Sequence, residues 1–189
     1  MALSLKFFSE FKKISVLGCG RWGSFIAWYL AAKKGRQVFS WGPAGDYSYE
    51  ILKASGKNEY IALDKSITLT CDLAAALSHA EVVVISISSQ GLRGFIRTIR
   101  QTGDVSDKIF VLCMKGIETG TGKRLSQILV ESGVSPDRIA VWVGPGHIQS
   151  VAQWIPNFMA MASATEAIMT RLVNMFIGPR ARLSYGLAT

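Results

Sequence analysis

The sequence predicts a doubly wound α/β domain with a mostly parallel sheet. Short apolar runs, several rich in β-branched residues, alternate with helix-compatible segments, and only a few residues connect them. The first apolar run, residues 14–17, leads directly into a glycine-rich turn and then into an apolar helical segment. A chain of 189 residues with 49% hydrophobic content can bury one core, so we expect a lead-in over residues 1–13 and one domain over residues 14–189.

The turn at residues 18–23 has the spacing G-x-G-x-x-G between a predicted strand and a predicted helix. In that context Gly18 allows a tight turn, Gly20 lets the backbone approach a pyrophosphate, and Gly23 lets the helix pack close to the strand. The first turn of the helix offers free N–H groups and the positive end of its dipole to phosphates. The pattern predicts that residues 14–189 form a dinucleotide-binding domain.

The first half of the chain supplies four predicted strands and four predicted helices. The first helix ends in two lysines and a glycine, a normal helix ending, and Asp72 is a preferred N-cap residue. The run VVVISIS is typical of a central parallel strand. We expect strands over residues 14–17, 37–41, 67–70 and 81–88, and helices over residues 22–32, 47–54 and 72–77, followed by a helix with Leu92, Phe95, Ile96 and Ile99 on one face.

The second half continues the alternation of strands and helices. A buried strand, IFVLCM, leads into a lysine and a glycine, and Gly133 marks the end of the helix that follows. We expect strands over residues 109–114, 139–143, 157–162 and 182–185, and helices over residues 121–132, 150–154 and 165–177. Because ligands bind at the carboxyl edge of such sheets, residues 18–23, 88–90, 144–146 and Lys115 should gather in space.

The charge balance indicates an anionic ligand. The formal net charge is +8, from 21 basic and 13 acidic residues, which suits a dinucleotide and a phosphorylated substrate. The basic residues are scattered and not arranged in a stripe with aromatic residues, so nucleic acid is not an expected partner. No apolar run reaches the length of a membrane span, and charged residues interrupt the N-terminal segment, which is therefore not a secretory signal.

The three cysteines, Cys19, Cys71 and Cys113, show neither a metal-ligand spacing nor a C-x-x-C pair. A sparse, odd set of cysteines suits the reducing cytoplasm, and we expect no metal site.

The end of the strand at residues 37–41 normally distinguishes NAD from NADP, through an acidic or a basic residue respectively. Residues 42–45 carry neither, so both cofactors stay open at this point.

The chain resembles the N-terminal domain of NAD(P)-dependent glycerol-3-phosphate dehydrogenases over about residues 13–186. The resemblance is carried by several segments that fit together in order along the chain. They are Gly18-Cys19-Gly20-Arg21-Trp22-Gly23, Trp41, Asn58-Glu59-Tyr60-Ile61, Ile87-Ser88-Ser89-Gln90-Gly91-Leu92-Arg93, Lys115-Gly116-Ile117-Glu118, and the block from Gly144 to Pro156. The combination is specific in a way that the glycine turn alone is not.

This resemblance implies reversible hydride transfer between NAD(P)(H) and sn-glycerol 3-phosphate or dihydroxyacetone phosphate. It places Lys115 between the nicotinamide and the substrate, where a cation can polarise a carbonyl or stabilise a developing alkoxide. It also implies that Arg21 and Trp22 offer backbone N–H groups to the pyrophosphate. The implied cofactor residues are Gly18, Cys19, Gly20, Arg21, Trp22, Gly23, Trp41, Ser88, Ser89, Lys115 and Ile148; the implied substrate residues are Lys115, Gly144 and Gly146.

Three departures separate this chain from the family pattern. The family has a second, all-helical domain with another essential lysine and the residues that hold the substrate phosphate, and this chain stops before it. Gly146, His147 and Ser150 stand where the family has Ser, Phe and Glu. His147 is either a new acid/base group or a replacement for a packed aromatic residue. The basic residue that follows the strand tryptophan in the family is replaced around Pro43.

These departures leave alternatives to a working dehydrogenase. One is a non-catalytic dinucleotide-binding module, which needs a partner chain or has lost activity. Another is a related dehydrogenase, such as a ketopantoate reductase or a sugar-acid dehydrogenase, although the segments around Lys115 and Gly144 argue against it. Without a helical domain over the site, apolar surface would be exposed, and we therefore expect some self-association into a homo-oligomer.

Overall fold

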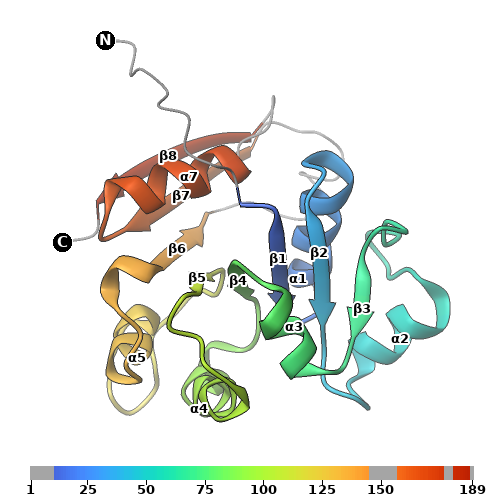
Figure 1. The fold of residues 1–189 in the computed structure, drawn as a ribbon, viewed down its shortest axis with the longest axis horizontal. Coiled ribbons are helices and arrows are strands. Elements are labelled where there is room, and N and C mark those ends of the chain that lie inside the picture. Colours follow the sequence, from blue (N-terminus) through green and yellow to red (C-terminus); the bar gives the residue numbers. More distant parts are fainter. Residues whose placement is uncertain (1–10, 145–156, 177–180, 188–189) are drawn as a thin grey trace.

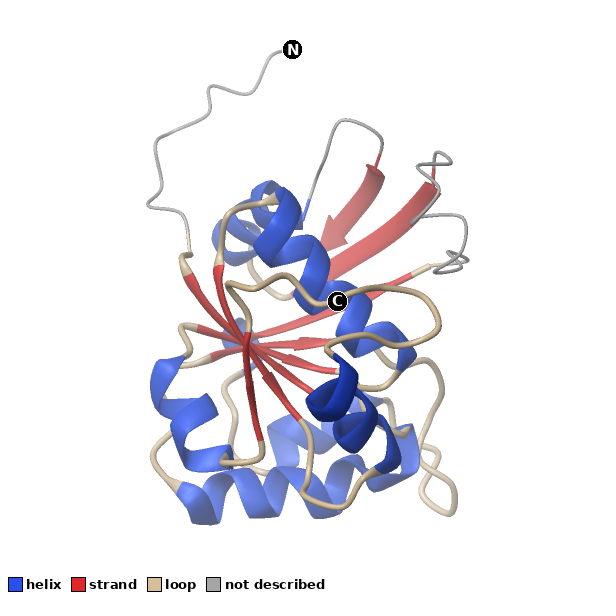
Figure 2. Cartoon of the chain, turned by 90° about the vertical axis from the view of Figure 1, so that its right-hand side faces the viewer, coloured by secondary structure: helices blue, strands red, loops and turns tan. Residues whose placement is uncertain are grey.

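The computed structural model describes residues 11–144, 157–176 and 181–187. In these ranges the chain forms one eight-stranded sheet with the strand order β3-β2-β1-β4-β5-β6-β7-β8. All neighbouring strands are parallel except β6 and β7, which are antiparallel. Helices lie on both faces of the twisted sheet (Figures 1 and 2). The expected doubly wound, mostly parallel α/β fold is therefore confirmed.

The boundaries of the elements follow the predicted alternation closely. The strands are β1 (Lys13–Leu17), β2 (Gln37–Trp41), β3 (Thr68–Thr70), β4 (Val82–Ile85), β5 (Ile109–Leu112), β6 (Ile139–Val143), β7 (Asn157–Ser163) and β8 (Ala181–Leu187). The helices are α1 (Arg21–Trp28), η1 (Tyr29–Lys33), α2 (Tyr47–Ser55), α3 (Leu73–His79), η2 (Ser89–Gly91), α4 (Leu92–Thr102), α5 (Leu125–Glu131), η3 (Pro136–Arg138) and α7 (Glu166–Phe176). The helix expected over residues 150–154 lies outside the described residues.

The central strands divide their side chains between two cores. Val82 and Val84 of β4 pack in the cluster that also contains residues of α1, η1 and α7. Val83 and Ile85 pack in the opposite cluster, with residues of α3, α4 and α5. Successive residues of a strand face opposite sides of the sheet, so a strand covered on both faces needs an unbroken apolar run. This requirement explains why the run at residues 82–85 contains no polar residue.

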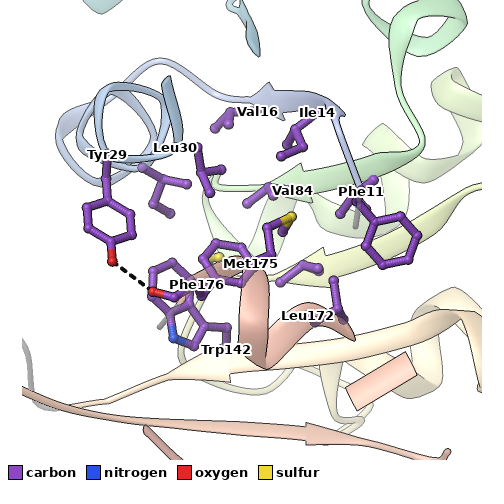
Figure 3. Close-up of a cluster of buried hydrophobic side chains, with 14 of the residues drawn as sticks. Phe11, Ile14, Val16, Tyr29, Leu30, Val84, Trp142, Leu172, Met175 and Phe176 are labelled. Atoms are coloured by element: carbon purple, nitrogen blue, oxygen red, sulfur yellow. Dashed lines mark hydrogen bonds between the residues drawn. The ribbon is translucent and has the colours of Figure 1, made fainter. Parts of the chain in front are cut away.

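Figure 3 shows the cluster that joins the first helix to α7. The ring of Trp142 lies 4.2 Å from that of Phe176, measured between centroids. The Tyr29 hydroxyl donates a hydrogen bond of 2.9 Å to the Phe176 carbonyl oxygen, and this hydroxyl group is buried. The contact fixes the end of α7 against η1, so segments 147 positions apart in the sequence support one core.

The first helix differs from the prediction in its second half. The expected helix over residues 22–32 begins at Arg21 and changes after Trp28 into the π-helical segment η1. Tyr29, whose hydroxyl reaches α7, is the first residue of this wider segment. Most residues around the helix are apolar, so their spacing does not distinguish α-helical from π-helical turns.

The helix expected over residues 121–132 begins only at Leu125, because the preceding residues form a tight hairpin. The Glu118 N–H donates to the Lys123 carbonyl oxygen at 2.9 Å, and residues 117 and 124 form an antiparallel bridge. Gly120 and Gly122 have φ values of 88° and 67°, which glycine adopts without a steric penalty. We call residues 115–124, which follow β5, the Lys115 loop.

Across the ranges that the structure describes, no helix has the length and apolar character of a membrane span.

Candidate functional site

Two glycines of the turn between β1 and α1 are required by the packing of the turn itself. Gly18 has a φ of 107°, and its N–H donates to the Trp41 carbonyl oxygen at 2.8 Å. A methyl group on Gly18 would overlap the Ser86 carbonyl oxygen, and one on Gly23 would overlap the Gly18 carbonyl oxygen. These contacts bring the start of α1 against the ends of β1 and β4.

Gly20 has a different role from the other two glycines of the turn. It is the N-cap residue of α1, with φ −64° and ψ −171°, and beyond Gly20 itself and its two chain neighbours no protein atom lies within 4 Å of the position of an added β-carbon. No side chain caps this end of α1. The first turn of the helix therefore keeps N–H groups for an anion, and a side chain at Gly20 would fill the space in front of them. This arrangement fits a pyrophosphate group.

A cavity of about 420 Å³ lies beside Gly20 at the carboxyl edge of the sheet. It lies among the segments that follow β1, β4, β5 and β6. The sheet continues from β1 to β2 and β3 on one side and to β4 and β5 on the other, so the direction in which successive strands are added reverses at β1. Open α/β sheets bind ligands at this switch point. Its lining consists of Gly20, Arg21, Trp22, Ser86, Ile87, Ser89, Cys113, Met114, Lys115, Trp142, Val143, Gly144 and Met159.

The charges around the cavity favour an anion. Arg21 and Lys115 are the charged residues of the described lining, and that lining contains no carboxylate. The Arg21 guanidinium lies over the Tyr60 ring, 4.6 Å from its centroid, and this contact holds the cation beside the start of α1. A negatively charged ligand therefore meets two cations in addition to the helix N-terminus.

The cavity brings together many, but not all, of the residues predicted for the site. Gly20, Arg21, Trp22, Ser89, Lys115 and Gly144 line it. Gly18, Cys19 and Gly23 lie behind the lining, in the turn that supports it, and Ser88 is exposed just before η2. Gly146 and Ile148 lie outside the described residues, so their predicted roles stay predictions.

Trp41 lies in the protein core. Its ring stacks on Phe95 at 5.2 Å between centroids, and its indole N–H donates to the Cys71 carbonyl oxygen at 3.0 Å. The Trp41 backbone carbonyl meets the glycine turn through Gly18, so this residue supports the turn without lining the cavity. A direct contact between its ring and a cofactor stays a prediction.

Cys19 also has a structural position. Its sulfur occupies the space beside Gly42, where a β-carbon would overlap it, and its side chain packs with Tyr49 and Leu52. Burial raises the pKa of the Cys19 thiol to about 11, so the thiol is neutral at physiological pH.

Asp46 is the acidic residue nearest to the end of β2. Its carboxylate accepts hydrogen bonds from the N–H groups of Ser48 and Tyr49, so Asp46 is the N-cap of α2.

Sequence reasoning missed several residues of the lining. Ser86 and Ile87 precede the predicted segment at 88–90, and Cys113 and Met114 precede Lys115, so β4 and β5 end earlier than expected. Ending the first of these strands three residues earlier and the second two residues earlier would have identified them. Met159 comes from β7, whose antiparallel direction brings it to the same edge, and no sequence signal indicated this contribution.

Asn58 closes the loop after α2 onto the first helix. Its side-chain nitrogen donates to the Ser24 hydroxyl at 2.7 Å, and its side-chain oxygen accepts the N–H groups of Tyr60 and Ile61 at 2.9 and 3.0 Å. These bonds place the Tyr60 ring under Arg21. Asn58 thus supports the cationic side of the cavity without lining it.

An ion network anchors the Lys115 loop to α4 and α5. The Arg93 guanidinium donates to both carboxylate oxygens of Glu118, at 2.7 and 2.8 Å, and to Glu131 at 3.0 Å. Thr121 also donates to Glu118, and Lys123 pairs with Glu131. The bonds from Arg93 and Thr121 lower the pKa of Glu118 to about 2, from an ordinary value of 4.5.

We expect the Arg93→Met variant to melt at a lower temperature than the wild type, by an amount that depends on pH. Glu118 binds fewer protons in the folded state than in the unfolded state, so its contribution is complete above pH 4.5 and is lost as the pH falls toward 2. The difference in melting temperature should therefore be largest near neutral pH and shrink in acid. Thermal unfolding followed by circular dichroism measures it. A difference that does not change with pH would contradict the assignment.

The fold and the site together define a dinucleotide-binding domain: an uncapped helix start, a glycine that opens onto a cavity, and cations at the switch point of a parallel sheet. The chain belongs to the family of NAD-dependent glycerol-3-phosphate dehydrogenases. The family model that matches residues 13–169 is described as the N-terminus of these enzymes. The resemblance expected from the sequence is confirmed, and other dehydrogenase families are set aside.

Individual relatives agree with this assignment. A glycerol-3-phosphate dehydrogenase (NAD(P)+) of Chlorobium phaeobacteroides is 37% identical over 158 residues, which cover 80% of this chain and 46% of the relative. That of Moorella thermoacetica is 34% identical and is covered to 51%. The crystal structure of glycerol-3-phosphate dehydrogenase from Coxiella burnetii matches with a TM-score of 0.80 at 23% identity, covering 93% of this chain and 54% of that one. The chain spans about half the length of the curated relatives it matches.

Proposed function

We propose that this chain binds NAD or NADP and serves as the cofactor half of a glycerol-3-phosphate dehydrogenase. The observation that carries the proposal is Gly20, where the protein leaves open the space that a side chain would fill. The uncapped first turn of α1 holds the pyrophosphate through the N–H groups of Arg21 and Trp22, and the Arg21 cation adds to the attraction. The bound dinucleotide supplies or accepts the hydride.

Lys115 acts on the substrate oxygen in this proposal. It is exposed, lines the cavity and follows β5 at the edge where Gly144 also lies. Its ammonium group can donate to the oxygen of dihydroxyacetone phosphate and stabilise the negative charge that develops there during reduction. In the opposite direction, the same group stabilises the alkoxide of sn-glycerol 3-phosphate.

The Gly20→Ala variant tests dinucleotide binding separately from folding. We expect its melting temperature to stay close to that of the wild type, because the added methyl group enters open space. We expect its affinity for NADH and NADPH to fall at least about tenfold, because the methyl group stands in front of the helix N–H groups. Titration followed by the fluorescence of the reduced nicotinamide measures both dissociation constants. A wild-type chain without affinity for either dinucleotide would refute the proposal.

A second candidate function is dinucleotide binding without turnover. Reduction of a ketone takes up a proton as well as a hydride, and the described cavity lining offers no carboxylate or imidazole that would resupply the proton given to the oxygen by Lys115. Burial raises the pKa of the Cys113 thiol, which also lines the cavity, so this thiol is a poor proton donor. Oxidation of NADH that depends on dihydroxyacetone phosphate, measured with this chain alone, would exclude the second candidate. Dinucleotide binding without such oxidation would favour it.

Two further properties belong to the proposal. The cytoplasm is the expected compartment, and it is supported by Cys19, Cys71 and Cys113, which are all free thiols. Self-association is supported by the exposed side chain of Ile117 in the Lys115 loop, which is 56% accessible. Light scattering over a wide concentration range measures the oligomeric state, and a monomer throughout would contradict self-association.

A further inference from the structure

Gln90 lies in η2 and joins the segment after β4 to the Lys115 loop through the nitrogen and the oxygen of its side-chain amide. Its nitrogen donates to the Ile117 carbonyl oxygen at 2.9 Å, and its oxygen accepts the Thr119 N–H at 2.8 Å. The same nitrogen lies 3.2 Å from the Ser89 hydroxyl oxygen, and Ser89 lines the cavity. One side chain thus pairs with two backbone groups of the loop, as a neighbouring strand would.

Lys115 lies between two anchored positions of the backbone. Two residues before it, the Cys113 N–H donates to the Ile85 carbonyl oxygen at 3.1 Å, which is the last bond between β5 and β4. Two residues after it, the Ile117 carbonyl oxygen is held by Gln90. Gly116 separates Lys115 from the second anchor and has a φ of 112°, a conformation that L side chains rarely adopt. A glycine in this position turns freely unless the residues beyond it are held.

The loop beyond this glycine is held together by its own hydrogen bonds. The hairpin bond between Glu118 and Lys123 keeps the loop internally ordered, and the pairing of Arg93 with Glu118 ties its base to α4. The hairpin bond and the ion pair both hold residues that follow Ile117 in the loop, and neither holds Ile117 itself. In the described part of the chain, Gln90 is the side chain that ties the loop to the segment after β4, where the cavity opens.

We propose that Gln90 is a positioning residue for Lys115: by bonding Ile117 and Thr119 it fixes the direction in which the Lys115 ammonium group enters the cavity. This inference rests on the proposed function, because it takes Lys115 as the group that meets the substrate oxygen. Gln90 does not itself line the cavity, so it acts through the backbone of the loop.

The Gln90→Met variant tests this role, because it keeps the length of the side chain and removes its hydrogen bonds. Amide hydrogen exchange should show the Thr119 N–H exchanging about tenfold faster than in the wild type, since two bonds to the loop are lost. Gln90→Glu retains the acceptor for Thr119 and loses the donor for Ile117, so its exchange should be intermediate. Gln101→Met, on the exposed last turn of α4, is the matched control and should leave this amide unchanged.

A second readout follows the ammonium group itself. With the lysines labelled as ¹³C-dimethyl groups, the Lys115 signal is assigned by its absence in Lys115→Arg. In the wild type, added NADH should shift this signal. In Gln90→Met the dissociation constant for NADH should stay within about twofold, because Gln90 does not line the cavity. The shift of Lys115 should fall to less than about half of the wild-type shift.

The possible outcomes separate this inference from the proposed function. A wild-type chain that binds neither NADH nor NADPH would refute the proposed function. The exchange rate of the Thr119 amide is measured without a ligand and would still decide whether Gln90 holds the loop. Unchanged exchange in Gln90→Met would overturn the inference. Faster exchange with an unchanged Lys115 shift would overturn it as well, because the loop would then be held without any effect on Lys115.

Discussion

The Gly23→Ala variant is expected to lose about 3 kcal/mol of unfolding free energy, which is a large share of the roughly 5–15 kcal/mol that stabilises a typical domain. A β-carbon on Gly23 would overlap the Gly18 carbonyl oxygen, which is backbone and cannot rotate away. Relief of the overlap requires α1 to move off β1. That movement would disrupt the turn whose N–H bond to Trp41 holds it against β2. Chemical denaturation followed by circular dichroism measures the loss.

Gly94→Ala is the matched control for this prediction. Gly94 also lies within a helix, α4, but apart from its chain neighbours and the backbone of α4 itself no atom lies within 4 Å of its added β-carbon. Alanine is a better helix former than glycine by about 1 kcal/mol, so this variant should be as stable as the wild type or more stable. Replacing glycine with alanine should thus lower the unfolding free energy at Gly23 and leave it unchanged or raise it at Gly94. A Gly23→Ala variant as stable as the wild type would contradict the close approach of Gly23 to the Gly18 carbonyl oxygen.

In the proposed reaction, replacing Lys115 with methionine is expected to reduce turnover about 100-fold or more. The variant keeps most of the side-chain length and removes the cation, and the loss of one group that stabilises a developing oxyanion typically has this magnitude. The dissociation constant for NADH should change by less than about threefold, because the proposed pyrophosphate contacts are the backbone N–H groups at the start of α1 and not the Lys115 side chain. Oxidation of NADH in the presence of dihydroxyacetone phosphate measures turnover.

Lys65→Met serves as the control for charge alone. Lys65 is exposed, lies between α2 and β3, and does not line the cavity. The Lys65→Met variant removes the same charge from the protein as Lys115→Met, and it should leave both the turnover and the affinity for NADH unchanged. Equal losses in the two variants would indicate that net charge attracts the substrate, whereas a loss confined to Lys115 would place the effect at the reacting oxygen.

Much of the fold followed from local pattern. The apolar run at β4, the Asp72 cap of α3 and the glycine turn each predicted an element that the structure contains, because hydrophobic periodicity and capping depend on neighbouring residues. The Asp72 carboxylate indeed accepts the Ala75 N–H at 3.0 Å. Predictions that depended on neighbours alone were therefore reliable here. The start of α5 was wrong, because residues 117–124 pair with one another as a hairpin.

The candidate site was predicted in outline. Gly20, Arg21 and Lys115 were identified because they follow predicted strands, and strand ends meet at one edge of a parallel sheet. Met159 was missed because it reaches that edge from an antiparallel strand. Trp41 was placed correctly at the end of β2, but its ring turns into the core toward Phe95, and the sequence pattern carries no information on that orientation.

The sequence by itself determined the class of the domain, because the strand, the glycine turn and the helix that make a dinucleotide site are consecutive and their geometry is local. The same glycine spacing predicted that Gly20 is open to a ligand and that Gly23 packs closely, and the packing agrees, because a β-carbon added to Gly20 meets open space whereas one added to Gly23 overlaps the Gly18 carbonyl oxygen. Only the tertiary structure decided that the Trp41 ring turns into the core and that Met159 reaches the cavity from an antiparallel strand. Only the tertiary structure joined Gln90 to a loop 27 residues away. Contacts between distant segments depend on how the sheet assembles, and no local pattern encodes them.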